Sequence, residues 1–163
     1  MTPMSYYPKP ETKQFSAGIG HNTVQNSTQL LTNIQAGAGP QDRVGRKIRV
    51  KSAEIALRAN PGSGAIRAVL YVPKTSTETL TLTSVAANAD NDAFWIVKDW
   101  ILNPQSNNIG HGQWIRHRFP MTMLTEYDGS AAGDTVKNNL KLLLFAANST
   151  TITGHTKVWF NDN

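Results

Sequence analysis

The residues of this sequence best suited to chemistry are cations that crowd into one stretch, residues 35–58. That stretch contains six Lys or Arg residues and two carboxylates, so it holds a balance of +4 out of the chain's formal net charge of +5. Such a density of positive charge favours contact with phosphate groups. The alternative is a charged strand face that is solvated and has no partner, and the pattern alone leaves both open. The six cations are Arg43, Arg46, Lys47, Arg49, Lys51 and Arg58.

Residue types used in catalysis and metal binding are present, but their spacing does not form a site. The chain of 163 residues has no cysteine, which excludes disulfides and thiolate-bound metals. No two of the histidines stand at metal-ligand spacing on a helix, and there is no G-x-S-x-G elbow or convincing Ser/His/Asp set. We therefore expect neither an enzyme nor a resident cofactor. The histidines are His21, His111, His117 and His155.

Four aspartates fall in segments rich in turn-forming residues: Asp90, Asp92, Asp128 and Asp134. A calcium ion between two of them, at a contact between subunits, is one interpretation, since calcium binds carboxylate oxygens. Solvated turn residues are the favoured interpretation, because Asp is common in turns.

The elements that position the cations are expected to be strands. Lys47, Arg49 and Lys51 alternate with apolar Ile48 and Val50, and a period of two is typical of a strand with one buried face. The apolar positions then move from even to odd numbers, because Ile55 and Leu57 continue the pattern. One extra residue near positions 52–54 would restore the register, so we expect a β-bulge there.

Short strand patterns fill most of the remaining chain, and no helical period of ten residues separates them. Residues 94–102 (FWIVKDWIL) are apolar on both faces and predict a central strand. Together the patterns predict an all-β protein with a single eight-stranded antiparallel jelly roll. The expected strands are residues 28–35, 47–59, 65–73, 94–102, 113–119, 121–127, 139–147 and 151–161.

The first residues differ in character, with Pro3, Pro8 and Pro10 and few groups that could pack. We expect an N-terminal arm over residues 1–22, which ends in a Gly-rich joint, and a jelly-roll domain over residues 23–163. The arm lacks the apolar stretch of a secretory signal, and no apolar run in the chain approaches the length of a membrane span.

Several segments together resemble a known family. Ile34 to Gly37 (IQAG), Gln41 to Ile48 (QDRVGRKI), Val50 to Ser52 (VKS) and Lys157 to Asn163 (KVWFNDN) are similar to the motifs of capsid proteins from circular, Rep-encoding single-stranded DNA (CRESS-DNA) viruses. The aromatic segment Phe94 to Asp99 and the Tyr127-Asp128-Gly129 turn also fit. The resemblance covers residues 27–163, and those capsid proteins are similar in fold to the coat proteins of small satellite viruses.

The resemblance implies a protein of the virion, assembled in the host nucleus. Sixty copies would form a T=1 icosahedral shell around circular single-stranded DNA. Expected partners are other copies of the chain, single-stranded DNA or other nucleic acid bound without sequence preference, and an unidentified host receptor, with no membrane. The residues expected to meet phosphates at the inner wall are Arg43, Arg46, Lys47, Arg49, Lys51, Arg116 and Arg118.

Two alternatives stay open at this stage. Arg43 or Arg46 could instead pair with a carboxylate such as Asp42 across a subunit contact, since arginine suits interface ion pairs as well as phosphate. The whole domain could also be a jelly-roll module that binds a carbohydrate or a receptor. One departure from the family bears on genome binding, because its usual arginine-rich arm has no counterpart in residues 1–22, where Lys9 and Lys13 are the cations.

Overall fold

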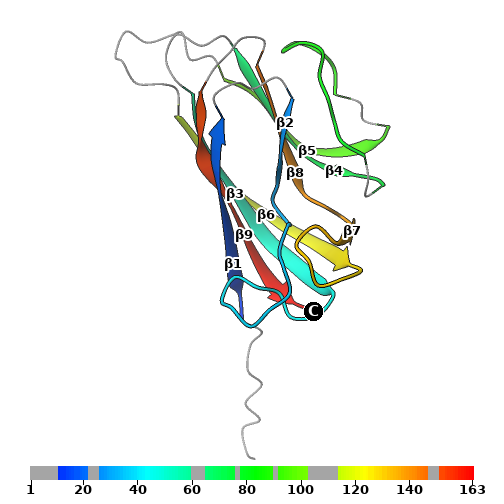
Figure 1. Cartoon of the computed structure of the whole chain (residues 1–163). Coiled ribbons are helices and arrows are strands. Elements are labelled where there is room, and N and C mark those ends of the chain that lie inside the picture. Colours follow the sequence, from blue (N-terminus) through cyan, green and yellow to red (C-terminus); the bar gives the residue numbers. More distant parts are fainter. Residues whose placement is uncertain are drawn as a thin grey trace, which may run out of the picture.

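Strands account for all the regular secondary structure in the described part of the chain. The computed structural model describes residues 11–21, 26–59, 65–75, 78–89, 92–102, 114–146 and 151–163. Among them no helix is long and apolar enough to cross a membrane. The strands are β1 (Lys13–His21), β2 (Ser27–Leu30), β3 (Lys47–Ala59), β4 (Ile66–Pro73), β5 (Phe94–Leu102), β6 (Trp114–Tyr127), β7 (Thr135–Lys137), β8 (Lys141–Ala146) and β9 (Ile152–Asp162), as Figure 1 shows.

The strands form two antiparallel sheets that face each other (Figure 1). One sheet has the order β1-β9-β3-β6-β7 and the other the order β2-β8-β4-β5. Strands distant in sequence therefore lie side by side, and the chain crosses repeatedly from one sheet to the other. This interleaving is the double Greek key of a jelly roll, so the predicted fold class is confirmed. The short β7 is an addition at the edge of the five-stranded sheet.

The core fills the space between the sheets, and β3 shows how the sequence pattern builds it. Ile48 and Val50 point inward before the bulge, and Ile55 and Leu57 point inward after it, all almost completely buried. The pairing of β3 with both neighbours shifts register between Val50 and Ser52. The predicted β-bulge is therefore confirmed near its expected place. It keeps the apolar residues inside and leaves the polar ones on the outer face.

The outer face of the four-stranded sheet is covered by its own loop. Leu80 and Leu82, from the connection between β4 and β5, pack with Tyr71 and Leu143 in a second apolar cluster. The backbone N–H of Leu80 also donates to the Tyr71 hydroxyl at 3.1 Å. In the described part of the chain, the five-stranded sheet has no comparable cover. Its outer face is the broad sheet surface that stays open.

The predicted boundary of the N-terminal arm is wrong for residues 13–21. These residues form β1, which pairs with β9 from Lys13 opposite Phe160 to His21 opposite Ile152. The inward residues of this strand, Phe15 and Ile19, are separated by small residues, so the sequence shows only a weak apolar alternation. Pairing along a whole neighbouring strand compensates for that weakness. The rest of the predicted arm, residues 1–10, lies outside the described residues.

The prediction of a central strand at residues 94–102 is also wrong. Among the described strands, β5 is the edge of its sheet and has only β4 as a neighbour. Trp95 and Ile101 are 54% and 61% exposed. Apolar residues on both faces suggested burial by two layers, but here they leave an apolar surface at the edge.

The two strands expected on either side of Pro120 are one continuous strand, β6. Pro120 lies opposite Ser52, next to the bulge in β3. A proline is tolerated there because the ladder is already irregular. Residues 28–35 give only the short β2, which ends at Leu30.

Candidate nucleic-acid interface

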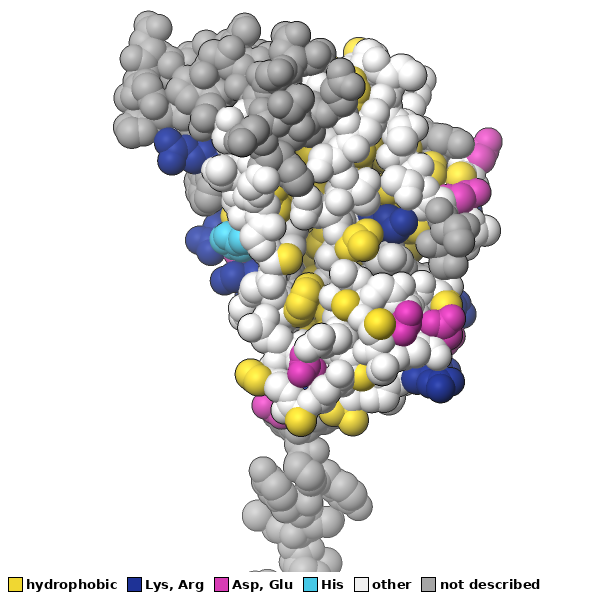
Figure 2. Space-filling model, in the orientation of Figure 1, with side chains coloured by type: hydrophobic (Ala, Val, Ile, Leu, Met, Phe, Trp, Pro, Cys, Tyr) yellow, Lys and Arg dark blue, Asp and Glu magenta, His cyan; other side chains and the backbone are white. Residues whose placement is uncertain are grey.

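The open outer face of the five-stranded sheet is strongly basic, and we call it the basic face. Alternation along β3, β6 and β9 turns their charged residues outward and their apolar residues toward the core. Figure 2 shows Lys and Arg side chains gathered with a histidine along the left edge, the side on which Figure 1 places this sheet. The outward cations of the described strands are Lys47, Arg49, Lys51, Arg58, Arg116, Arg118, Lys137 and Lys157, against the carboxylates Glu54 and Glu126.

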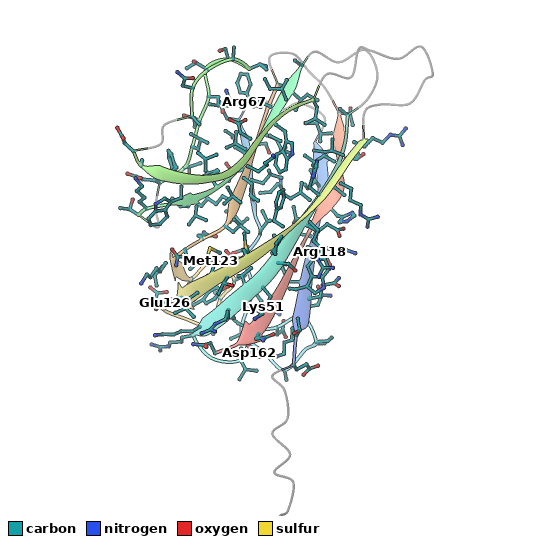
Figure 3. The ribbon with its side chains drawn as sticks, turned by 180° about the vertical axis from the view of Figure 1, so that it is seen from behind. Lys51, Arg67, Arg118, Met123, Glu126 and Asp162 are labelled. Atoms are coloured by element: carbon teal, nitrogen blue, oxygen red, sulfur yellow. The ribbon has the colours of Figure 1, made fainter. Side chains whose placement is uncertain are left out.

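The bulge in β3 decides which cations share this face. Arg49 lies before it and Lys51 lies within it, and both are exposed. They line a shallow hollow together with the last residues of the chain, Asn161 to Asn163. The carboxylate in this hollow, Asp162, is already engaged: Lys13 Nζ lies 2.8 Å from it, and the backbone N–H of Val44 donates to it at 2.7 Å. Figure 3 shows Lys51 and Asp162 on this sheet.

Glu54 is the carboxylate at the centre of the face. Its Oε1 accepts hydrogen bonds from Arg116 Nη2 at 3.1 Å and Nε at 3.2 Å, and lies 3.1 Å from His155 Nε2. The His155 hydrogen bond, together with the bonds and charge of Arg116, holds the pKa of Glu54 below its ordinary value, although burial opposes this. Glu54 therefore remains ionised and compensates part of the charge of Arg116. This makes Arg116 less available to a phosphate than the cations around it.

Arg118 makes a different contact, although the strand register places it directly opposite Glu54. Its guanidinium carbon lies 3.9 Å from the centroid of the Trp159 ring. Its Nη2 is 3.3 Å from Ser52 Oγ. Arg118 is exposed, so its charge remains accessible on this face (Figure 3).

Lys47 and Arg46 lie at the end of the face where β3 begins. Lys47 Nζ is 3.4 Å from Glu126 Oε1, and its side chain is half exposed. Glu126 also stands opposite Lys137 of β7. Arg46 is exposed in the turn before β3, and its backbone oxygen accepts a hydrogen bond from Tyr127 N at 2.8 Å. Both residues are placed where an anion can reach them.

Arg43 does not belong to this surface, and its predicted contact with phosphate is wrong. The side chain is fully buried. It donates to the backbone oxygens of Ile34 at 2.8 Å, Gly129 at 2.6 Å and Ala131 at 3.3 Å, and also to that of Gly45. Burial also excludes Arg43 from an ion pair across a subunit contact.

Asp42, the carboxylate proposed as partner in that ion pair, is used locally. It accepts hydrogen bonds from Gly39 N at 3.0 Å and Gln35 Nε2 at 3.2 Å. The motif residues 35–43 therefore form a folded turn whose chemistry is structural.

The residues predicted from the sequence to meet phosphate did not include Arg58, Lys137, Lys157 and Trp159 of the basic face. The pattern of the last strand contained the information, because Lys157 and Trp159 alternate with buried Val158 and Phe160. What was missing was the knowledge that β9 lies beside β3. Only this adjacency places Lys157 on the same surface as Lys51 and Arg118.

The aspartates give no metal centre within the described residues, where no group of three or more His, Asp or Glu side chains is placed to hold an ion. Asp134 accepts a hydrogen bond from Ala131 N at 2.8 Å, so it stabilises its own turn. Asp90 lies outside the described residues. A calcium ion at a contact between subunits stays a prediction.

Comparisons with known proteins find chains of similar architecture. No protein-family model matches the chain, and no curated protein matches it in sequence. Solved structures do resemble it. They include tomato aspermy virus, with 14% identity over 98% of this chain and 82% of that one and a TM-score of 0.48. The 60-mer of the BFDV capsid protein has 17% identity over 93% of this chain and 91% of that one, with a TM-score of 0.39.

A third resembling structure is a Bacillus endospore appendage described as a disulfide-linked pilus. It has 12% identity over 99% of this chain and 100% of that one, with a TM-score of 0.43. All three identities lie below 25% and all three TM-scores below 0.5, so these likenesses give no evidence on function.

Proposed function

We propose that this protein is a viral capsid protein that assembles into a closed shell around nucleic acid. In the proposed particle, sixty copies form a T=1 icosahedron that encloses circular single-stranded DNA, and the basic face lines the interior. The observation that carries the proposal is the asymmetry of the sandwich. One sheet is covered by its own loop, whereas the other leaves a broad basic face open.

A concentration of cations on a sheet suits a polyanion bound without sequence preference. Lys and Arg that meet phosphates release counterions, which gives affinity but does not read the bases. Within the proposal, the residues that contact phosphate are Arg46, Lys47, Arg49, Lys51, Arg116 and Arg118 from the sequence, with Arg58 and Lys157 added by the fold.

Self-assembly is supported by the edge of the sandwich formed by β5 and β6, which we call the apolar edge. In the part of the chain that the structure describes, β5 has one neighbour, and the pairing of β6 with β7 involves only Glu126 and Tyr127 of β6. Trp100 of β5 contacts the rings of His117 and Phe119 on β6. Elsewhere on β5, Trp95, Val97 and Ile101 are exposed. Unpaired strand edges with exposed apolar residues suit a contact with another protein surface, here a further copy of the chain.

The proposed residence is the virion, with assembly in the host nucleus and a host receptor retained as predictions from the sequence resemblance. A calcium ion between subunits is kept as a prediction from the aspartates in the turn-forming segments.

Particle size and nucleic-acid content test the proposal. Sixty copies of a 17.9 kDa chain make a particle of roughly 1 MDa, so the purified protein should elute far ahead of a monomer at near-neutral pH and moderate salt. The particles should carry nucleic acid, and replacement of Arg46, Lys47, Arg49 and Lys51 with Gln should lower the ratio of absorbance at 260 nm to that at 280 nm.

Elution as a monomer would refute the shell and favour a carbohydrate- or receptor-binding module. Variant particles with as much nucleic acid as the parent would refute the phosphate assignment. Loss of assembly by the variant in the absence of nucleic acid would instead give these cations a role in subunit contacts.

A further inference from the structure

The Arg118 side chain crosses one strand to reach the ring of Trp159. Arg118 is on β6 and Trp159 is on β9, and β3 lies between them. The residue of β3 that Arg118 passes over is Ser52, which stands opposite Trp159 in the register. Ser52 points outward but is only 7% exposed. A larger side chain at this position would occupy the path of the arginine, so the small serine makes the contact possible.

The result is a stack of two flat groups in the middle of the basic face. The guanidinium carbon of Arg118 lies 3.9 Å from the centroid of the indole ring of Trp159. Trp159 remains partly exposed and Arg118 is exposed. Planar guanidinium groups and aromatic rings are the surfaces on which unpaired bases stack, whatever their sequence. Lysine could supply the charge of Arg118 but has no plane.

The surroundings of the stack suit the phosphates on either side of a stacked base. Lys157 is the outward residue adjacent to Trp159 along β9, and Lys51 precedes Ser52 on β3. The carboxylate opposite Arg118, Glu54, is already bonded to Arg116 and His155. Arg118 is therefore not drawn into an ion pair with Glu54, and its guanidinium stays on the ring.

We propose that the Arg118–Trp159 stack is a binding site for an unpaired base, and that the basic face therefore prefers single-stranded to double-stranded nucleic acid. The inference rests on the proposed function, which supplies the phosphate contacts. A duplex can use those contacts, but its bases are stacked on each other and cannot reach the indole or the guanidinium. A single strand can use both.

The test compares binding of a short oligothymidylate with binding of a DNA duplex of equal length, for the full chain and its variants at one salt concentration. Arg118→Lys keeps the positive charge and removes the planar guanidinium group. Its affinity for the oligothymidylate should fall at least about fivefold, while its affinity for the duplex stays within about twofold of the parent. Trp159→Leu should show the same selective loss. Lys98→Arg, which exchanges one cation for the other at an exposed position of β5 on the other sheet, is the control and should leave the preference unchanged.

Tryptophan fluorescence gives an independent readout. Oligothymidylate should quench the parent more than Trp159→Leu, whereas the duplex should quench both equally. The inference is overturned if Arg118→Lys binds the single strand as well as the parent does, or loses affinity for both ligands equally. In either case the phosphate contacts of the proposed function would stand. Failure of the parent to bind either ligand would overturn the proposed function together with this inference.

Discussion

The guanidinium carbon of Arg43 lies 3.8 Å from the centroid of the Tyr127 ring. Tyr127 in turn donates its hydroxyl to the backbone oxygen of Thr32 at 2.7 Å. Burial raises the pKa of Tyr127 well above its ordinary value, although the positive charge of Arg43 opposes the shift. The hydroxyl therefore stays protonated and keeps donating. Through this pair the turn at residues 32–45 is fixed to the turn after β6.

Arg43→Lys should destabilise the fold because a single ammonium group cannot replace a guanidinium that binds four backbone oxygens. The expected loss in the free energy of unfolding is about 3 kcal/mol or more, since buried carbonyl groups would lose charged donors. Urea denaturation measures it. The matched control is Arg46→Lys, an exposed position whose effect should stay within about 0.5 kcal/mol. Equal effects at the two positions would contradict the structural role of Arg43.

Gly154→Ala should weaken the pairing of β9 with β3. A Cβ atom at this position would lie 1.9 Å from the backbone oxygen of Ala56, which cannot move aside without shifting the strand. The expected cost is about 1–3 kcal/mol in the free energy of unfolding. Gly18→Ala is the control, because a Cβ there meets nothing within 4 Å. A thermal or urea melt that shows equal stability for the two variants would argue against this close packing.

The carboxylate of Glu54, at the centre of the basic face, makes the stability of the fold depend on pH in the acid range. The pKa of Glu54 is lowered on folding, so its ionised form adds stability that is complete above the ordinary value of 4.5 and is lost as the pH falls through the lowered pKa. The charged and titratable groups that face it are Arg116 and Arg118 from β6 and His155 and Lys157 from β9.

Glu54→Gln should therefore be less stable than the parent at neutral pH, and the difference should shrink below pH 4.5. Denaturation midpoints across this range measure it. A difference that stays constant with pH would show that Glu54 does not contribute through its charge.

The basic face should determine how binding depends on salt. Arg49→Gln with Lys51→Gln removes two exposed cations, so the plot of log affinity for single-stranded DNA against log salt should lose about 0.7 in slope per cation. Lys74→Gln with Lys98→Gln makes the same change in charge near β5, on the other sheet, and should leave the slope unchanged. If both double variants shift the slope equally, binding depends on net charge and not on this face.

The apolar edge should control assembly. Trp95→Ser with Ile101→Ser removes two exposed apolar side chains from β5, so the concentration needed for assembly should rise at least about tenfold while the subunit stays folded. Light scattering follows assembly, and circular dichroism checks the fold. Val44→Ser, at a residue 58% exposed in the loop before β3, is the control and should assemble normally. Unaltered assembly of the β5 variant would place the subunit contacts elsewhere.

The sequence by itself determined the all-β character, most of the strands and the bulge in β3, and it predicted the jelly-roll class. Each depends on the alternation of side chains along one strand, as with Ile48 and Val50 before the bulge and Ile55 and Leu57 after it. It also predicted that Arg49 and Lys51 stand on the side of the strand opposite its apolar residues, and both are exposed.

Only the tertiary structure decided which strands are neighbours, and this changed the roles of particular residues. In the sequence Arg43 is one of six cations in the basic stretch. In the fold it is buried and donates hydrogen bonds to four backbone oxygens that two distant turns bring together. The sequence of residues 94–102 predicted a central strand, yet β5 has a single neighbour among the described strands. Trp159 and Arg118 are 41 positions apart (159 minus 118) and meet only because β9 and β6 both pair with β3. Alternation along a strand is a local property of the backbone, whereas burial and contact across strands depend on long-range pairing that no local pattern encodes.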